Sequence, residues 1–149
     1  MVYLSADHAG FELKEKIKEF LTNEGYEVKD CGAFEYDKED DYPDFISQAA
    51  QAISEDPNSR AIILGGSGQG EAIVANKFPN VRAAVYYGSA EEMPSLTRQH
   101  NNSNILSLGA RFLSVEEATK AVKLFLETKF SEDERHIRRI DKIKQIETR

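Results

Sequence analysis

The chain has 149 residues, of which 40% are hydrophobic and 30% are charged, a composition typical of globular proteins. Its length is enough for one sizeable hydrophobic core, so we expect residues 1–149 to form a single domain. With 19 Lys and Arg against 26 Asp and Glu, the net charge of −7 argues against nucleic acid or an anionic membrane as the main partner.

The sequence carries no pattern of a membrane-spanning or secreted protein. No apolar run reaches the roughly 18 residues that indicate a membrane-spanning helix. The N-terminus MVYLSADHAG turns polar after four residues and lacks a basic leader region, so we expect no signal peptide. The single cysteine, Cys31, cannot form an internal disulfide or a zinc cluster, which favours a reducing, cytoplasmic location.

Apolar runs alternate with amphipathic helix patterns along the chain. We expect strands at residues 2–6, 26–32, 60–66, 82–87 and 104–110. We expect helices at residues 11–24, 43–54, 90–98 and 132–147, and two more that begin near residues 70 and 114. Gly25 stands where a helix cap belongs, and Pro43 suits a first helical turn. Ser114 and Glu117 form a capping box at the start of their helix.

Strand–helix alternation with short connections predicts an α/β fold with a mostly parallel sheet of about five strands. The most apolar strand, RAIILGG at residues 60–66, is expected at the centre of the sheet. Ligands of such sheets bind at the carboxyl ends of the strands. That rule selects the loops at residues 5–10, 65–71 and 109–111, which we expect to lie together.

The stretch LGGSGQGEAIVANK, residues 64–77, places a glycine-rich loop before a helix. It matches neither the Walker loop nor the dinucleotide fingerprint, which needs a further glycine. One interpretation is a tight turn from strand to helix. The other, which the run of glycine and polar residues favours, is a row of backbone amides that binds negative charge.

Glu71 follows this loop directly and has two interpretations. A carboxylate in the first turn of a helix interacts favourably with the helix dipole, whatever its function. A carboxylate beside anion-binding amides can also act as a general base, because the amides stabilise the enediolate oxygen that proton abstraction creates.

Asp7 and His8 lie at the carboxyl end of the first strand, where an Asp-His pair favours a functional role. His100 lies in the polar stretch RQHNNSN, predicted as a loop, and spacing alone leaves its role open. The third histidine, His136, lies in another part of the sequence. The histidines are too scattered for a local metal site and HExxH and CxxC are absent, so we predict no metal.

The last predicted helix, ERHIRRIDKIKQIE, places Arg135 and Arg139 on one face. A stripe of four isoleucines on another face must be buried, either on the same domain or on a second subunit. Arg111, at the end of the last strand, is a third candidate for binding phosphate through its guanidinium group. The alternative for each arginine is a surface ion pair with one of the many carboxylates.

Taken as a set, the motifs of this chain resemble those of the type B ribose-5-phosphate isomerases, a family that includes galactose-6-phosphate isomerase subunits. The resemblance covers nearly the whole chain. The matching stretches are SADHAG (5–10), DYPDF (41–45), GGSGQGEAIVANK (65–77), RQHNN (98–102), NILSLGAR (104–111) and RHIRRID (135–141).

The resemblance implies a Rossmann-like three-layer α/β/α fold with a five-stranded parallel sheet and an extra C-terminal helix. It also implies a homodimer whose active sites are shared between subunits, and no metal or cofactor; a tetramer stays open. The implied reaction is the interconversion of ribose 5-phosphate and ribulose 5-phosphate through a cis-enediolate, a step of the non-oxidative pentose phosphate pathway.

By position, the resemblance assigns four kinds of role. Asp7 and His100 would assist ring opening, and His8 and Asn101 would contact substrate. The phosphate would be held by Arg111, Arg135 and Arg139. The anion hole would be formed by Gly66, Ser67, Gly68, Gln69 and Gly70.

One position departs from many members of the family. Where those members carry a catalytic cysteine, this chain has Gly65, and Cys31 lies on another predicted strand. The GGSGxGE motif resembles instead a mycobacterial-like branch with a glutamate at the position of Glu71. We therefore expect Glu71 to remove the C2 proton and return it to C1. The alternatives are an isomerase of another aldose phosphate, such as a six-carbon one, and a non-catalytic phosphate- or nucleotide-binding module.

Overall fold

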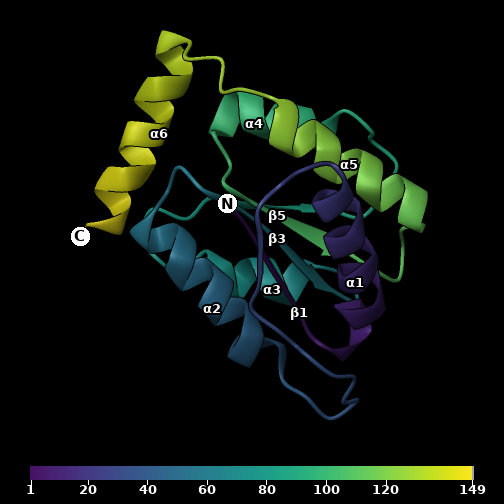
Figure 1. Ribbon diagram of the computed structural model, residues 1–149. Coiled ribbons are helices and arrows are strands. Elements are labelled where there is room, and N and C mark those ends of the chain that lie inside the picture. The colour runs from purple at the N-terminus through teal and green to yellow at the C-terminus, as the bar shows by residue number, and fades with distance from the viewer. Residues whose placement is uncertain (149) are drawn as a thin grey trace.

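Five parallel strands form one sheet in the order β2-β1-β3-β5-β4 (Figure 1). In a computed structural model that describes residues 1–148, the strands are β1 (Val2–Ala6), β2 (Val28–Asp30), β3 (Arg60–Gly65), β4 (Ala83–Tyr86) and β5 (Ile105–Gly109). The helices are α1 (His8–Asn23), α2 (Tyr42–Glu55), α3 (Gln69–Ala75), α4 (Met93–Asn101), α5 (Val115–Glu127) and α6 (Glu134–Glu147).

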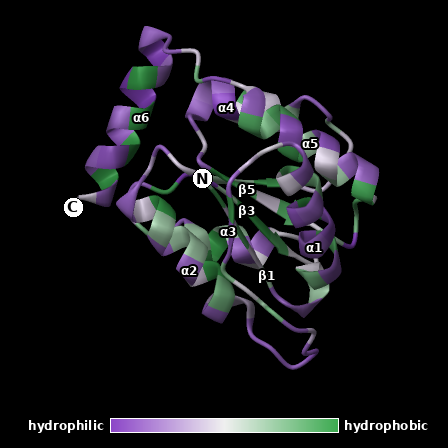
Figure 2. Cartoon of the chain, viewed as in Figure 1, coloured by the Kyte–Doolittle hydropathy of each residue, from purple (hydrophilic) through white to green (hydrophobic). Residues whose placement is uncertain are grey.

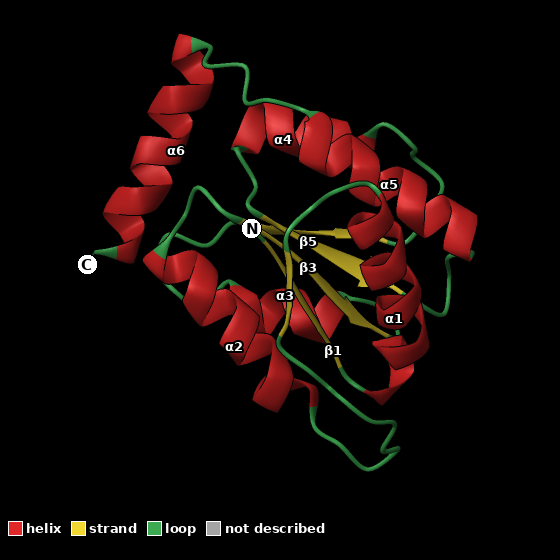
Figure 3. Ribbon diagram, in the orientation of Figure 1, coloured by secondary structure: helices red, strands yellow, loops and turns green. Residues whose placement is uncertain are grey.

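Helices cover both faces of the sheet, which gives three layers, α/β/α (Figure 3). One apolar cluster joins the sheet to α1 and α5, and a second joins it to α2 and α3. The strands are the most continuously apolar part of the chain (Figure 2). Residues 61–64 of β3 are fully buried, as expected for the central strand of a parallel sheet. The predicted fold class is confirmed.

The expected elements are all present; β2 is shorter than expected, and α4 lies three residues further along the chain than the expected 90–98. β2 has three residues rather than the seven-residue stretch 26–32, because it pairs only with β1 at the edge of the sheet. α4 continues to Asn101, so His100 lies in a helix and not in the predicted loop. The helix ends at Asn102, whose left-handed conformation (φ 46°) asparagine tolerates better than most residues. The Ser114–Glu117 capping box is formed as predicted.

A buried ion pair fixes α1 against the edge of the sheet. The Lys14 side chain is completely buried, and its Nζ lies 2.7 Å from both carboxylate oxygens of Asp30 at the end of β2. The Lys18 Nζ reaches the same carboxylate at 2.9 Å. Two ammonium groups therefore hold the pKa of Asp30 below its usual value, against the burial that acts to raise it. The start of α1, which carries His8, is held in place through this contact.

α6 stands beside α4 at one side of the molecule (Figure 1). His136 is its one buried residue among those described, and three isoleucines of the predicted apolar stripe are 41–60% exposed. These are Ile137, Ile143 and Ile146. The single chain therefore leaves most of this stripe uncovered. Within residues 1–148, no helix combines the length and apolarity needed to cross a membrane.

Candidate active site

The three loops expected at the carboxyl edge of the sheet lie together. Leu64 of β3 is in register with Ala6 of β1, and Gly65 with Gly109 of β5, so the strands end side by side. Beyond the ladder, the amide of Ala110 donates to the Gly65 carbonyl at 2.8 Å. The amide of Arg111 donates to the Gly66 carbonyl at 3.1 Å. The convergence expected from the parallel sheet is confirmed.

The glycine loop is held in shape by its own backbone and by β5. Gly68 adopts a left-handed conformation (φ 80°) just before α3, which a residue with a side chain adopts only with strain. Its carbonyl accepts a hydrogen bond from the buried Ser107 hydroxyl at 2.7 Å. The amide of Gln69 donates to Ser67 Oγ at 3.3 Å. The loop that runs from Gly66 to Gly70 is therefore fixed without a ligand.

Glu71 is buried behind this loop, with 4% of its surface exposed. Its carboxylate fills the space beside Gly65, so closely that a Cβ added there would overlap the carboxylate atoms. Burial raises the pKa of Glu71 above its usual value, and the nearby charge of Asp7 raises it further. Backbone amides, including that of Gly68, act in the opposite direction. A raised pKa makes this carboxylate a stronger base than an ordinary glutamate, which suits a group that accepts and returns a proton.

Two further side chains border the loop. The Arg111 guanidinium lies against Gly66. A Cβ on that glycine would be 3.1 Å from the guanidinium, which is a tight contact. The Tyr42 ring lies across Gly70, where a Cβ would come within 2.7 Å of the Tyr42 hydroxyl. Both glycines are therefore needed for these side chains to approach the backbone.

Asp7 and His8 occupy the first turn of α1, at the same edge. Asp7 is the N-cap residue, and its Oδ1 accepts from the amides of Ala9 and Gly10 at 3.0 and 3.2 Å. Such caps satisfy helix donors that otherwise lack a partner. The His8 ring is partly exposed, and its Nδ1 lies 2.7 Å from Asp40 Oδ1. The hydrogen bond to Asp40 raises the pKa of His8 above its usual value.

Three residues at this edge are of types that can bind a metal ion, and they form a hydrogen-bonded cluster. One ligand atom from each of Asp7, His8 and Asp40 lies within 4.8 Å of the others. Asp7 Oδ1 is bound to helix amides, however, and His8 Nδ1 is bound to Asp40. These atoms are already paired with hydrogen-bond partners, so we interpret the cluster as a fixed polar network.

His100 and Asn101 lie at the opposite, amino edge of the sheet, in the last turn of α4. The chain enters β5 three residues later, and its first residue, Ile105, pairs with the starts of β3 and β4. The buried Arg98 fixes this end of α4: its guanidinium donates to the Ser103 carbonyl at 2.6 Å. It also donates to the Thr128 carbonyl at 3.1 Å, next to α5.

The arginines of α6 belong to the amino edge as well. The rings of His100 and His136 lie 4.7 Å apart between centroids, which joins the start of α6 to the end of α4. At the other end of α6, Glu147 accepts a hydrogen bond from the Asn80 amide before β4. Arg135 and Arg139 are exposed, and none of the ion pairs within residues 1–148 involves them.

The candidate site residues therefore form two groups at opposite ends of the strands. The carboxyl edge carries the possible base, the glycine loop and one arginine, with Asp7 and His8. The amino edge carries the two α6 arginines, with His100 and Asn101. One chain does not bring the two groups together.

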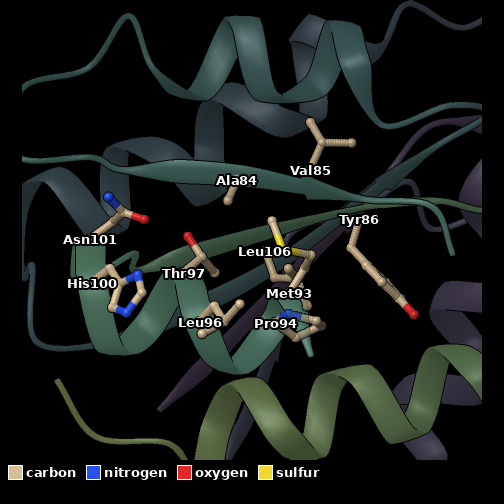
Figure 4. Close-up of a pocket in the computed structure, with 10 residues that line it drawn as sticks. All are labelled: Ala84, Val85, Tyr86, Met93, Pro94, Leu96, Thr97, His100, Asn101 and Leu106. Carbon is tan, nitrogen blue, oxygen red and sulfur yellow. The ribbon is translucent and has the colours of Figure 1, made fainter. Parts of the chain in front are cut away.

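Figure 4 shows the residues that line a cavity between β4 and α4, with His100 and Asn101 at one end. The volume of this cavity is about 190 Å³. Its walls are mostly apolar side chains, such as Met93, Pro94 and Leu106. Among residues 1–148, no lysine or arginine lines it, so it lacks the fixed positive charge that a phosphate requires. Glu71 and the glycine loop lie outside this cavity.

Four residues of these networks were not singled out from the sequence. Tyr42 lies within the DYPDF stretch that carried the family resemblance, so that motif was an available signal. His136 lies within RHIRRID, and its contact with His100 depends on the packing of two helices. Arg98 likewise opens the RQHNN stretch of the resemblance, whereas Asp40 had no signal of its own, because it lies in an acidic run.

The fold and the carboxyl edge together define an α/β enzyme of Rossmann-like architecture, with a buried carboxylate beside an amide-lined loop. A family model described as Ribose/Galactose Isomerase matches residues 2–143. The chain belongs to the ribose/galactose isomerase family.

Its relatives cover nearly the full chain. Ribose-5-phosphate isomerase B of Mycobacterium tuberculosis is 47% identical over 98% of this chain and 89% of its own length. The Escherichia coli enzyme of the same name is 36% identical over 99% of this chain and 97% of its own. A crystal structure of the Mycoplasma genitalium enzyme with bound ribulose-5-phosphate superposes with a TM-score of 0.94, at 37% identity, and covers 99% of this chain and 95% of that one.

Proposed function

We propose that this protein interconverts ribose 5-phosphate and ribulose 5-phosphate, with Glu71 as the base. The single observation that carries the proposal is the position of the Glu71 carboxylate, buried against the glycine loop. The names of the relatives support the reaction: the mycobacterial relative is 47% identical to the chain over 146 residues, and the Mycoplasma genitalium structure holds ribulose-5-phosphate.

The reaction needs a base next to groups that stabilise negative charge. In the open-chain aldose, Glu71 removes the proton from C2, and the electrons move onto the carbonyl oxygen as the C1–C2 enediolate forms. The loop amides from Gly66 to Gly70, with Ser67, stabilise that oxygen. Glu71 then returns the proton to C1 while the proton of the C2 hydroxyl is transferred to the oxygen on C1, which leaves a carbonyl at C2 and yields the ketose. The raised pKa of Glu71 suits a group that must both take and give this proton.

The ring must first open, and the phosphate must be held. Asp7 and His100 transfer the protons of ring opening, and His8, with Asn101, contacts the sugar phosphate. Arg111 binds the phosphate together with Arg135 and Arg139. A guanidinium matches phosphate geometry with two parallel hydrogen bonds. No step uses a metal or a cofactor, so we expect full activity after exhaustive dialysis against a chelator.

The two groups of residues are joined if a second copy of the chain supplies the amino edge. A homodimer with a two-fold axis then forms two equal sites, each with Glu71 from one subunit and the α6 arginines from the other. The uncovered isoleucines of α6 support this, because a partner would bury them. A tetramer built from such dimers would keep the same sites.

The buried, free thiol of Cys31 supports a reducing, cytoplasmic location.

The base assignment is tested with Glu71→Gln, which keeps the shape of the side chain and removes its basicity. We expect kcat to fall by about 10³-fold or more, with substrate binding by calorimetry largely retained. Exchange of the substrate's C2 proton with heavy water, followed by NMR, should be lost with it. The control is Glu12→Gln, an exposed carboxylate on α1. Near-normal turnover in Glu71→Gln would remove Glu71 as the base.

Site sharing is tested by mixing two impaired variants, assayed at a substrate concentration well below the KM of the arginine variant. Glu71→Gln damages only the carboxyl edge, and the double change Arg135→Ala with Arg139→Ala damages only the amino edge. A mixed dimer then has one site with both edges intact, so activity should reappear when the two are coexpressed. If each site belongs to one chain, coexpression gives no recovery. A panel of five- and six-carbon aldose phosphates decides the sugar length.

A further inference from the structure

The acidic loop between β2 and α2 makes one contact with the candidate site that the proposed reaction does not use. In this loop, residues 35–41, Asp40 Oδ1 accepts a hydrogen bond from the backbone amide of His8 at 3.1 Å. The same oxygen lies 2.7 Å from His8 Nδ1. Asp40 thus holds both the backbone and the ring of His8, although the two residues are 32 positions apart.

The Asp40 carboxylate is unusually placed for a residue in an acidic surface loop. Its side chain is 7% exposed, and its second oxygen, Oδ2, is buried without a hydrogen-bond partner among the described residues. A carboxylate in such a place is costly unless a positive charge lies beside it. The bound oxygen of Asp40 contacts the His8 ring, and this ring balances the charge when it is protonated.

The groups around His8 act on its charge from every side. Asp40 is the largest influence and raises the pKa of His8 through the hydrogen bond to Nδ1. Asp7, on the preceding residue, raises it further, whereas partial burial and Arg111 lower it. The Tyr36 ring, from the acidic loop, meets the imidazole edge-on at 6.3 Å. The net direction is a raised pKa, so the imidazolium form is favoured.

We propose that Asp40 is a positioning residue that fixes His8 Nδ1 as a donor and keeps the ring cationic, with Nε2 free to donate to the substrate's phosphate. This deepens the proposed function and rests on it for the identity of the anion. The geometry places a second positive charge beside Arg111 at the carboxyl edge. The acidic loop is then part of the anion-binding site, because it supplies the charge that holds a cation there.

The first test uses the free protein and needs no substrate. The midpoint of the His8 titration is followed by NMR in the wild type and in Asp40→Asn, with the His8 signal assigned from His8→Gln among the three histidines. The midpoint should move to lower pH in Asp40→Asn. The control, Glu39→Gln, removes the same charge from the neighbouring exposed position and should leave the midpoint nearly unchanged. Equal midpoints in wild type and Asp40→Asn would overturn the proposal.

The second test separates substrate binding from turnover. His8 is cationic below its pKa, so KM should be lowest at low pH and should rise as pH increases through that pKa. In Asp40→Asn this rise should begin at lower pH, with KM at neutral pH roughly tenfold higher and kcat little changed, as for the loss of one charge-assisted hydrogen bond. Asp40→Glu, which keeps the charge, should recover part of the KM.

The outcomes distinguish this proposal from the proposed function. A rise in KM that is the same at every pH, with an unchanged His8 titration, would show that Asp40 only supports the loop and would overturn the positioning role. A shifted titration in a protein that fails to isomerise ribose 5-phosphate would keep the link between Asp40 and His8 and overturn the reaction.

Discussion

The two edges of the sheet present their polar groups in different ways. At the carboxyl edge, strand ends and the turns that follow them place the groups, and backbone hydrogen bonds such as Arg111 to Gly66 fix them. At the amino edge, the groups lie on the last turn of α4 and on α6, and helix packing through Arg98 and His136 places them. Glu71 is buried, whereas Arg135 and Arg139 are exposed.

This difference separates a preorganised, buried group from exposed ones. A base must be preorganised and partly desolvated, and the interior of a strand-to-helix turn provides both. Charged groups that bind a phosphate can begin exposed and become covered when substrate and partner arrive. The carboxyl edge is therefore the more preorganised of the two in a single chain. Substitutions at the two edges should affect stability, turnover and substrate binding differently.

The largest expected effect is on the amino edge, through stability. Arg98→Met removes the hydrogen bonds to the carbonyls of the buried Ser103 and the partly buried Thr128, and leaves both acceptors without this donor. We expect the free energy of unfolding to fall by roughly 3 kcal/mol, measured by urea denaturation. Arg60→Met is the control, because that guanidinium bonds only within its own turn, at Asn58 and Ser59. An equal loss in both variants would show that Arg98 has no special role.

The next effect falls on the carboxyl edge. Gly65→Ala places a Cβ where the Glu71 carboxylate lies, so the carboxylate must move. A displacement of about 1 Å is enough to reduce turnover about 100-fold. Gly25→Ala is a control for substitution at a glycine, since nothing lies within 4 Å of its Cβ position, although its own backbone strain costs stability. Steady-state kinetics measure both; unchanged kcat in Gly65→Ala would mean that the Glu71 position is not critical.

A smaller effect is expected for the α6 arginines. Arg139→Ala should raise KM roughly tenfold and leave kcat nearly constant, because a phosphate contact is lost equally from ground and transition states. The adjacent Arg138→Ala removes an equally exposed guanidinium from a different face of α6 and should change KM little. If both variants behave alike, the effect is one of general charge and the two edges are not joined through Arg139.

The smallest expected effect is on thermal stability, in a comparison of the wild type with the neutral variant Glu71→Gln at several pH values. The pKa of Glu71 is raised in the folded protein, so its contribution to stability is complete below the unfolded value, 4.5, and is lost as pH rises through the folded pKa. Glu71→Gln has no such loss. Its Tm should therefore exceed that of the wild type by a margin that grows with increasing pH, as calorimetric scans would show. A margin that is constant with pH would contradict the raised pKa.

The carboxyl edge could be largely predicted from the sequence, because its groups are local to strand ends. The apolar run of β3, the glycines and Glu71 are contiguous, and parallel strands bring the neighbouring loops to the same edge. The amino edge could be predicted only in part. The ending of α4 depends on the left-handed Asn102, and the contacts of Arg98 depend on where α5 ends. Asp40 could not be linked to His8, since 32 residues separate them.

The overlap between the Gly65 position and the Glu71 carboxylate has a consequence for how such chains diverge. A side chain at position 65 and a glutamate at position 71 compete for one volume. Introducing a cysteine at 65 first would displace the proposed base, Glu71, and removing Glu71 first would leave the site without it. The free energies of the two changes are then strongly non-additive. Each single substitution gives an impaired enzyme, so positions 65 and 71 are expected to change together. The form with Gly65 and Glu71 and the form with a cysteine at position 65 should therefore rarely interconvert.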